Sequence, residues 1–317
     1  MPKFKQTPSG RVSGGTVTDF AAGRTRLATR AVQLVDYYSD GGQTRHFLFR
    51  FPDFGRPGDD VWRGISPGEF LVLDIPGIGA APFSFTYPPN QYGEFCVLVR
   101  HQDGVDRALF DMEVGSTLGA RGPFGKPWPL AALRDERVLV VAAGDGLAPL
   151  VMLIDHLLTE HWCERLALVY GARDPEAQML TPERERWQKQ IDVFDTLEQG
   201  AGYAPPAAAV TPPYADANIM PRYPATSIRR RLSGTATEAL PGVLARFGRP
   251  SRALLCGSVT MMRAAAAYLV AQRLPPSAIW VSAREQMSCV AGLCAHRYQT
   301  RCAEGPTFRW DKAGTWL

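Results

Sequence analysis

Three cysteines lie close together near the C-terminal end of the sequence, at Cys289, Cys294 and Cys302. Small residues separate them, and a Gly-Pro-Thr-Phe stretch follows at residues 305–308. Thiolates at such spacing on a tight loop are how a chain holds an iron–sulfur cluster. A cluster normally takes four protein ligands, and His296 is a candidate for the fourth, because histidine replaces cysteine on one iron of Rieske centres. The alternative is a segment that has kept its shape and lost its metal.

The stretch from Glu285 to Phe308 resembles the C-terminal [2Fe-2S] segment of ferredoxin-reductase-like electron-transfer subunits. This family includes the electron-transfer subunit of dihydroorotate dehydrogenase, the gamma subunit of cytoplasmic hydrogenase or sulfhydrogenase, and a subunit of anaerobic sulfite reductase. Its pattern is E-x-x-M-x-C-G-x-G-x-C-G-x-C, then a last cysteine before G-P-x-F, and the three cysteines match it. Arg297 occupies the remaining ligand position. Arginine is a permanent cation and does not suit an iron held by thiolates, so the resemblance implies a [2Fe-2S] site that lacks one family ligand.

A second candidate site is a strand followed by a glycine turn and a helix start, at residues 140–150. Glycines such as Gly144 and Gly146 let backbone N–H groups approach a pyrophosphate, and the dipole of the helix that starts near Pro149 favours the anion. The stretch resembles the family's G-G-I-G-L-A-P-L, with Ala143 in place of a glycine and Asp145 in place of an apolar residue. The resemblance implies an NAD(P) site.

Two further stretches extend the resemblance to the nucleotide. Tyr-Gly-Ala-Arg-Asp-Pro at 170–175 resembles Y-G-A-R-T-P, which implies that Arg173 lies near the adenosine ribose. Cys-Gly-Ser-Val-Thr-Met-Met at 256–262 resembles C-G-P-P-x-M-M, which implies that Gly257 and Met261 border the nicotinamide. Methionines at this spacing also fit the core face of a helix. Arg173 and the arginines at 229–231 are candidates to hold a 2′-phosphate, although the sequence alone does not bring them near one.

The resemblance also implies a flavin site. Gly-Ala-Ala-Pro-Phe-Ser-Phe-Thr at 79–86 resembles G-E-A-P-I-S-I-S, in which backbone groups and a hydroxyl hold the isoalloxazine of FAD. The matching residues here are Pro82, Phe83, Ser84 and Thr86, with Ser84 as the hydroxyl. Broader relatives have an arginine that neutralises the flavin phosphate where this sequence has Ala81, as hydrogenase-type subunits do.

The second flavin motif is Asp-Gly-Val-Asp-Arg-Ala-Leu at 103–109, which matches G-x-V-T/S-x-x-L. The match implies that the FAD pyrophosphate meets a helix N terminus at Gly104 and Val105. Asp106 occupies the position of the hydroxyl. A carboxylate is a good N-cap when the helix end is empty but repels a pyrophosphate, a charge that Arg107 or Arg100 could offset.

The pattern of elements changes once along the chain. Short strands separated by Gly, Pro and Asp clusters predict an antiparallel β-barrel at 25–134. Alternating strands and helices predict a parallel-sheet α/β domain at 135–283, interrupted by a Pro-rich loop at 200–231. Gly122 belongs to a stretch that resembles the G-x-x-G-P-x-G turn joining the two domains. An N-terminal extension (1–24) and the [2Fe-2S]-type C-terminal segment (284–317) complete the expected organisation.

Composition sets the broad class. The chain has 317 residues, 45% of them hydrophobic, and a formal net charge of +4. This length and composition are enough for a large core. The basic residues are spread along the chain, so they do not indicate a nucleic-acid-binding surface. It has no apolar run of membrane-spanning length and no signal peptide, so we expect a cytoplasmic protein with reduced cysteines. Cys96, Cys163 and Cys256 lie in apolar surroundings and are expected to be buried thiols.

Together these features predict an electron-transfer flavoprotein subunit that passes electrons between NAD(P)H, FAD and a partner redox subunit of a hydrogenase-like complex. An NAD(P)H-linked diaphorase-type activity would follow. The alternative is a cofactor-poor structural subunit of such a complex, because departures occur at all three cofactor sites: Asp106, Ala143 with Asp145, and Arg297. A stand-alone flavin reductase is a third possibility.

Overall fold

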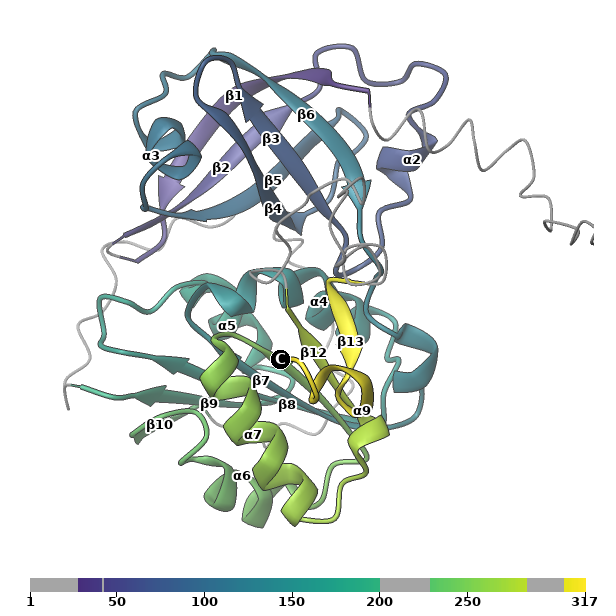
Figure 1. Ribbon diagram of the computed structural model, residues 1–317, viewed down its shortest axis with the longest axis vertical. Coiled ribbons are helices and arrows are strands. Elements are labelled where there is room, and N and C mark those ends of the chain that lie inside the picture. The colour runs from purple at the N-terminus through teal and green to yellow at the C-terminus, as the bar shows by residue number, and fades with distance from the viewer. Residues whose placement is uncertain (1–27, 42, 200–228, 284–304) are drawn as a thin grey trace, which may run out of the picture.

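The computed structural model describes residues 28–41, 43–199, 229–283 and 305–317, which form a barrel above a parallel sheet (Figure 1). The predicted metal ligands Cys289, Cys294, His296 and Cys302 lie outside the described residues. The predicted architecture, an antiparallel barrel followed by a parallel-sheet domain, is confirmed.

Six antiparallel strands close the barrel in the order β1-β2-β5-β4-β3-β6. Alternate residues along them face inward, and phenylalanines such as Phe47, Phe83, Phe85 and Phe95 fill the interior. The strands are β1 (Arg30–Ser39), β2 (Thr44–Arg50), β3 (Phe70–Ile75), β4 (Gly79–Tyr87), β5 (Glu94–Arg100) and β6 (Thr117–Phe124), with the short helices α2 (Asp60–Arg63) and α3 (Val105–Phe110) at the barrel surface.

The second domain is a seven-stranded sheet in the order β10-β9-β8-β7-β11-β12-β13, parallel except for β13. Helices α4 and α5 cover one face, and α6, α7 and α9 cover the other. The strands are β7 (Arg137–Ala143), β8 (Arg165–Ala172), β9 (Asp192–Leu197), β10 (Arg229–Ser233), β11 (Arg252–Cys256), β12 (Ile279–Ser282) and β13 (Thr307–Arg309). The helices are α4 (Val151–Thr159), α5 (Thr181–Trp187), α6 (Leu240–Phe247), α7 (Val259–Ala271) and α9 (Trp310–Ala313).

The strand order reverses between β7 and β11. From β7 the chain adds β8 and β9 on one side, and later places β11 and β12 on the other. A crevice opens at the carboxyl ends of the strands at such a switch point, and this is where open α/β sheets bind ligands. The glycine turn after β7 and the Cys-Gly turn after β11 flank it.

Three elements differ from the sequence-based expectation. The helix expected to start near Pro149 begins with a 3-10 turn, η2 (Gly144–Leu150), before α4; Pro149 has no N–H to donate to an α-helical hydrogen bond. The arginines at 229–231 do not end a loop but form β10, paired in parallel with β9. Finally, β13 and α9 add residues 305–317 to the sheet domain, with Ala313 and Leu317 in its core.

Candidate functional site

The flavin-type motif lies on β4, where alternate side chains face opposite ways. Phe83 packs inside the barrel, so it can offer only backbone atoms to a ligand outside. Pro82, Ser84 and Thr86 belong to the outer face, and the Thr86 hydroxyl is fully buried there without a hydrogen-bond partner among the described residues. Buried hydroxyls are nearly always paired, so this one marks a place for a polar group. The polar edge of an isoalloxazine ring fits that requirement.

The second flavin-type motif forms the start of α3. Gly104 has φ of +78° and no atom within 4 Å of the position that a side-chain Cβ would take, so the helix start is open to a ligand. Beside it lies a groove of about 440 Å³ with mainly apolar walls, including Ile75, Ile78 and Met112. Arg107 and Asp111 also line it, with Arg107 Nε 4.0 Å from Asp111 Oδ2. An apolar groove beside an open helix start fits the adenosine part of FAD.

The glycine turn after β7 touches the Cys-Gly turn after β11. A Cβ on Gly146 would lie 2.5 Å from the carbonyl oxygen of Cys256 and 2.7 Å from Cα of Gly257, so only glycine fits. Gly144 has φ of +54°, and no other atom lies within 4 Å of the position that a Cβ would take there. The structure therefore brings two motifs more than a hundred residues apart into contact, with open space at the Cβ direction of Gly144. A dinucleotide fits this arrangement.

The neighbouring residues divide between core and crevice. Met262 is buried in the sheet core, whereas Met261 is half-buried with its Cε against Gly257. Ser258 caps α7, its hydroxyl accepting a hydrogen bond from Met261 N at 3.3 Å. Pro149 is buried in η2, and its carbonyl accepts a hydrogen bond from Trp128 Nε1 at 3.0 Å. Asp145 is half-buried in the first turn of η2.

The flavin-type and nucleotide-type motifs meet at the domain boundary. β4 packs against η2 and α4, and Met152 of α4 contacts the barrel core. A Cβ added to Gly122 would lie 3.2 Å from the carbonyl oxygen of Phe70. Gly122 belongs to β6, the strand that leads into the nucleotide domain. β4 and the glycine turn therefore lie against each other between the domains.

The two ends of the cysteine-containing stretch are held at this boundary. Ala283 N donates to the carbonyl of Pro306 at 2.9 Å, and Lys126 N donates to the carbonyl of Gly305 at 2.7 Å. The Thr307 hydroxyl donates to the carbonyls of Lys126 and Pro127. The described residues contain no group of His, Cys, Asp and Glu suited to a metal ion.

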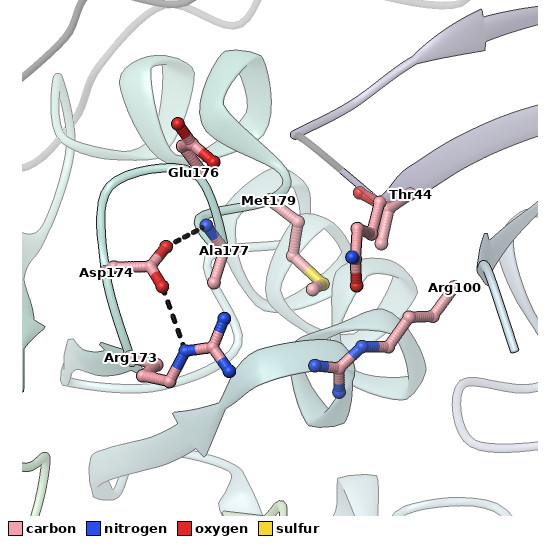
Figure 2. Close-up of a pocket in the computed structure, with 8 residues that line it drawn as sticks. Thr44, Arg100, Arg173, Asp174, Glu176, Ala177 and Met179 are labelled. Carbon is pink, nitrogen blue, oxygen red and sulfur yellow. Dashed lines mark hydrogen bonds and ion pairs between the residues drawn. The ribbon is translucent and has the colours of Figure 1, made fainter.

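Arg173 follows β8 and lies at a small pocket between the domains (Figure 2). Its Nε donates to Asp174 Oδ2 at 2.9 Å, and Asp174 Oδ1 accepts from Ala177 N at 2.8 Å. The hydrogen bond from Arg173 lowers the pKa of Asp174. Arg100 faces the same pocket from the barrel.

A buried polar cluster between the domains was not predicted from the sequence. The Tyr87 hydroxyl donates to Glu183 Oε1 at 2.7 Å, and the Asp40 carboxylate accepts from Leu180 N at 2.8 Å. Burial raises the pKa of Glu183 and of Asp40, and lowers the pKa of His46 to about 4. His46 Nδ1 lies 3.8 Å from Asp40, too far for a hydrogen bond, and a neutral imidazole makes no ion pair. The members are far apart in sequence, so no local pattern could reveal them.

Comparison with known proteins agrees with this geometry. No family model matches the chain. Sulfhydrogenase 1 subunit gamma of Pyrococcus furiosus is 24% identical over 303 residues, covering 89% of this chain and 91% of that protein. Sulfhydrogenase 2 subunit gamma of the same organism is 24% identical over 259 residues, covering 78% and 85%. The chain is similar to these gamma subunits over most of its length.

The chain has further relatives of the expected kind. A probable electron transfer subunit of dihydroorotate dehydrogenase B from Methanopyrus kandleri is 36% identical over 136 residues, covering 43% of this chain and 48% of that protein. Among solved structures, an NADH-dependent reduced ferredoxin–NADP oxidoreductase superposes with a TM-score of 0.64 at 20% identity, covering 89% and 91% of the two chains. The cytochrome b5 reductase domain of Ulva prolifera nitrate reductase gives 0.58 at 15% identity, covering 81% and 98%. These likenesses show a ferredoxin-reductase-like fold.

Proposed function

We propose that this chain is the electron-transfer subunit of a multi-subunit redox enzyme, with FAD on the barrel and NAD(P)H at the switch point of the sheet. One observation carries the proposal: the outer face of β4, with its buried unpaired Thr86 hydroxyl, packs against the glycine turn that borders Gly257. The two motifs are in contact, and cofactors held by them would be close together, as hydride transfer requires.

The chain's own residues position the cofactors. Thr86 and Ser84 would hold the polar edge of the flavin, and the open start of α3 at Gly104 and Val105 would hold its phosphates. Gly144 and Gly146 would admit the NAD(P)H pyrophosphate, with Gly257 and Met261 beside the nicotinamide. An FAD held there would supply the chemistry of accepting a hydride from NAD(P)H and releasing electrons singly.

The anchored ends of the cysteine-containing stretch support an electron exit at the domain boundary. Ala283 and Gly305–Thr307 are fixed to each other and to Lys126. A [2Fe-2S] cluster held by Cys289, Cys294, Cys302 and His296 remains a prediction, with Arg297 at the family's fourth cysteine position. A partner redox subunit, a diaphorase-type activity and a cytoplasmic location are likewise proposals. Among the described helices, none is long and apolar enough to cross a membrane.

The alternative of a cofactor-poor structural subunit is less favoured. It rests on Asp106, Ala143 and Asp145 within the described motifs, and on Arg297, which lies outside the described residues. The fit that a cofactor needs is retained, because the crevice still has a glycine at 146, where no side chain fits, and Thr86 still lacks a partner among the described residues. A relative named as a gamma subunit matches 89% of the chain. A relative named as an electron transfer subunit matches 43% of it.

Flavin binding is tested through Thr86. Thr86→Val keeps the shape and removes the hydroxyl, so we expect FAD affinity to fall about tenfold or more, whereas Thr86→Ser should retain it. The measurement is FAD titration of the anaerobically purified protein, followed by absorbance on addition of NADH or NADPH, with an iron assay. A colourless, iron-free wild-type protein that takes up no added FAD would refute the proposal in favour of the structural subunit.

A further inference from the structure

The pocket at Arg173 lies between two elements that the fold brings together from different domains. Thr44 and Arg100 are opposite each other on β2 and β5 of the barrel, and Arg173 to Met179 follow β8 of the sheet. Its volume is about 160 Å³, roughly that of five water molecules. Pockets that hold a whole small molecule are larger, about 300 Å³ or more. The space therefore suits one phosphate-sized group of a ligand that lies partly outside it.

Two guanidinium groups face this space. Figure 2 shows the side chains of Arg100 and Arg173 pointing toward each other across the pocket, with the Glu176 carboxylate directed away. Arg100 is half-buried, and its side chain has no hydrogen bond or ion pair among the described residues. Arg173 uses only Nε for Asp174, which leaves its terminal nitrogens for another acceptor. Two like charges repel unless an anion lies between them, and arginine forks match phosphate oxygens.

A third group completes the polar wall. The side chain of Thr44 lines the pocket and is 4% exposed, and its hydroxyl has no hydrogen-bond partner among the described residues. A buried unpaired hydroxyl beside two guanidiniums is a donor available to a phosphate oxygen. Asp174 does not oppose the anion strongly, because it is already bound to Arg173 and to Ala177 N.

The position of the pocket identifies the phosphate. β8 neighbours β7, on the side of the sheet away from β11. In doubly wound sheets the adenosine ribose of a dinucleotide bound at the glycine turn reaches the end of the next strand, where an arginine accommodates the 2′-phosphate of NADP. We propose that Arg100 and Arg173 hold the 2′-phosphate of NADPH, with the Thr44 hydroxyl as a further donor, so that the chain prefers NADPH to NADH. This inference rests on the nucleotide site of the proposed function.

Calorimetric titration of the full-length, flavin-loaded protein with NADP⁺, NAD⁺, 2′,5′-ADP and 5′-ADP tests the inference. We expect NADP⁺ and 2′,5′-ADP to bind about tenfold or more tighter than their counterparts. Arg100→Gln and Arg173→Gln should each weaken NADP⁺ about tenfold to a hundredfold and weaken NAD⁺ far less. Arg100→Lys should restore part of the loss. Arg63→Gln, on exposed α2, is the control and should change neither ligand.

The outcomes separate the two proposals. Equal affinity for NADP⁺ and NAD⁺, or arginine variants that weaken both equally, overturns the assignment of the 2′-phosphate and leaves the nucleotide site intact. Failure of the folded wild-type protein to bind either dinucleotide overturns the nucleotide site of the proposed function itself. Because NAD⁺ binding reports on the fold of each variant, a misfolded variant cannot imitate the expected loss.

Discussion

At the scale of single residues, Gly146 gives the sharpest test of the crevice. A methyl group there would lie 2.5 Å from the carbonyl oxygen of Cys256, in strand β11, which is held in place by its pairing with β7. We expect Gly146→Ala to cost about 1–3 kcal/mol of stability and to weaken dinucleotide binding, measured by thermal unfolding and calorimetric titration. Gly242→Ala is the control: Gly242 lies in α6 with no neighbour within 4 Å, and alanine there should stabilise by about 0.5–1 kcal/mol. Equal effects of the two substitutions would contradict the close approach.

A site motif could be predicted from the sequence where all of its residues lie in one short stretch of the chain. The glycine turn is recognisable because its spacing and its place after an apolar strand are contained in a single short stretch of sequence. The alternation of β4 could also have separated Phe83 from Ser84 and Thr86 on the sequence pattern alone. The pairing of Arg100 with Arg173 could not, since it depends on how the barrel sits against the sheet.

At the scale of elements, the hydrogen bond from Tyr87 to Glu183 joins β4 to α5 across the domain boundary. Tyr87→Phe removes the donor and leaves a buried carboxyl with an unmet acceptor, so we expect a loss of about 1–3 kcal/mol of unfolding free energy. Urea denaturation measures it. Tyr92→Phe, at a side chain 66% exposed, is the matched control and should be neutral. A neutral Tyr87→Phe would mean that Glu183 finds other partners at no cost.

Elements with a hydrophobic period were predictable, and those held by pairing alone were not. β7 and β11 are nearly continuous apolar runs, a pattern typical of strands buried in a parallel sheet. β10 is three arginines, a leucine and a serine, a composition with no apolar pattern, and only its backbone pairing with β9 makes it a strand. β13 likewise depends on antiparallel pairing with β12, which no short window of sequence contains.

At the scale of the whole molecule, the boundary between the domains contains buried titratable groups from both sides. His46 is packed among Tyr38 of β1, Asp40 of the β1–β2 turn and Tyr87 of β4, with Glu183 and Arg184 of α5 across the boundary. Burial lowers the pKa of His46 to about 4 and raises the pKa of Asp40 and Glu183. The two kinds of shift act on stability at opposite ends of the pH range.

The sign for His46 follows from proton linkage. The unfolded chain takes up a proton on this histidine near pH 6.5, while the folded protein resists it until about pH 4, so the stability contribution is complete above 6.5 and is lost as the pH falls to 4. The loss amounts to about 3 kcal/mol at most. The buried carboxyls act the other way: their raised pKa means that stability present at low pH is lost as they ionise at higher pH.

Two substitutions separate these contributions. His46→Gln removes the imidazole, so its unfolding free energy should vary less than that of wild type between pH 6.5 and 4. Glu183→Gln removes one buried carboxyl, so its stability should fall less as the pH rises above the ordinary range of a glutamate. Urea unfolding across pH 4 to 9 measures both. His46→Gln should change the pH dependence of stability only at acidic pH, and Glu183→Gln only at higher pH. If His46→Gln and wild type instead showed the same dependence between pH 6.5 and 4, the imidazole would be protonated or hydrated in the folded protein. The domain boundary would then be open to water at this point.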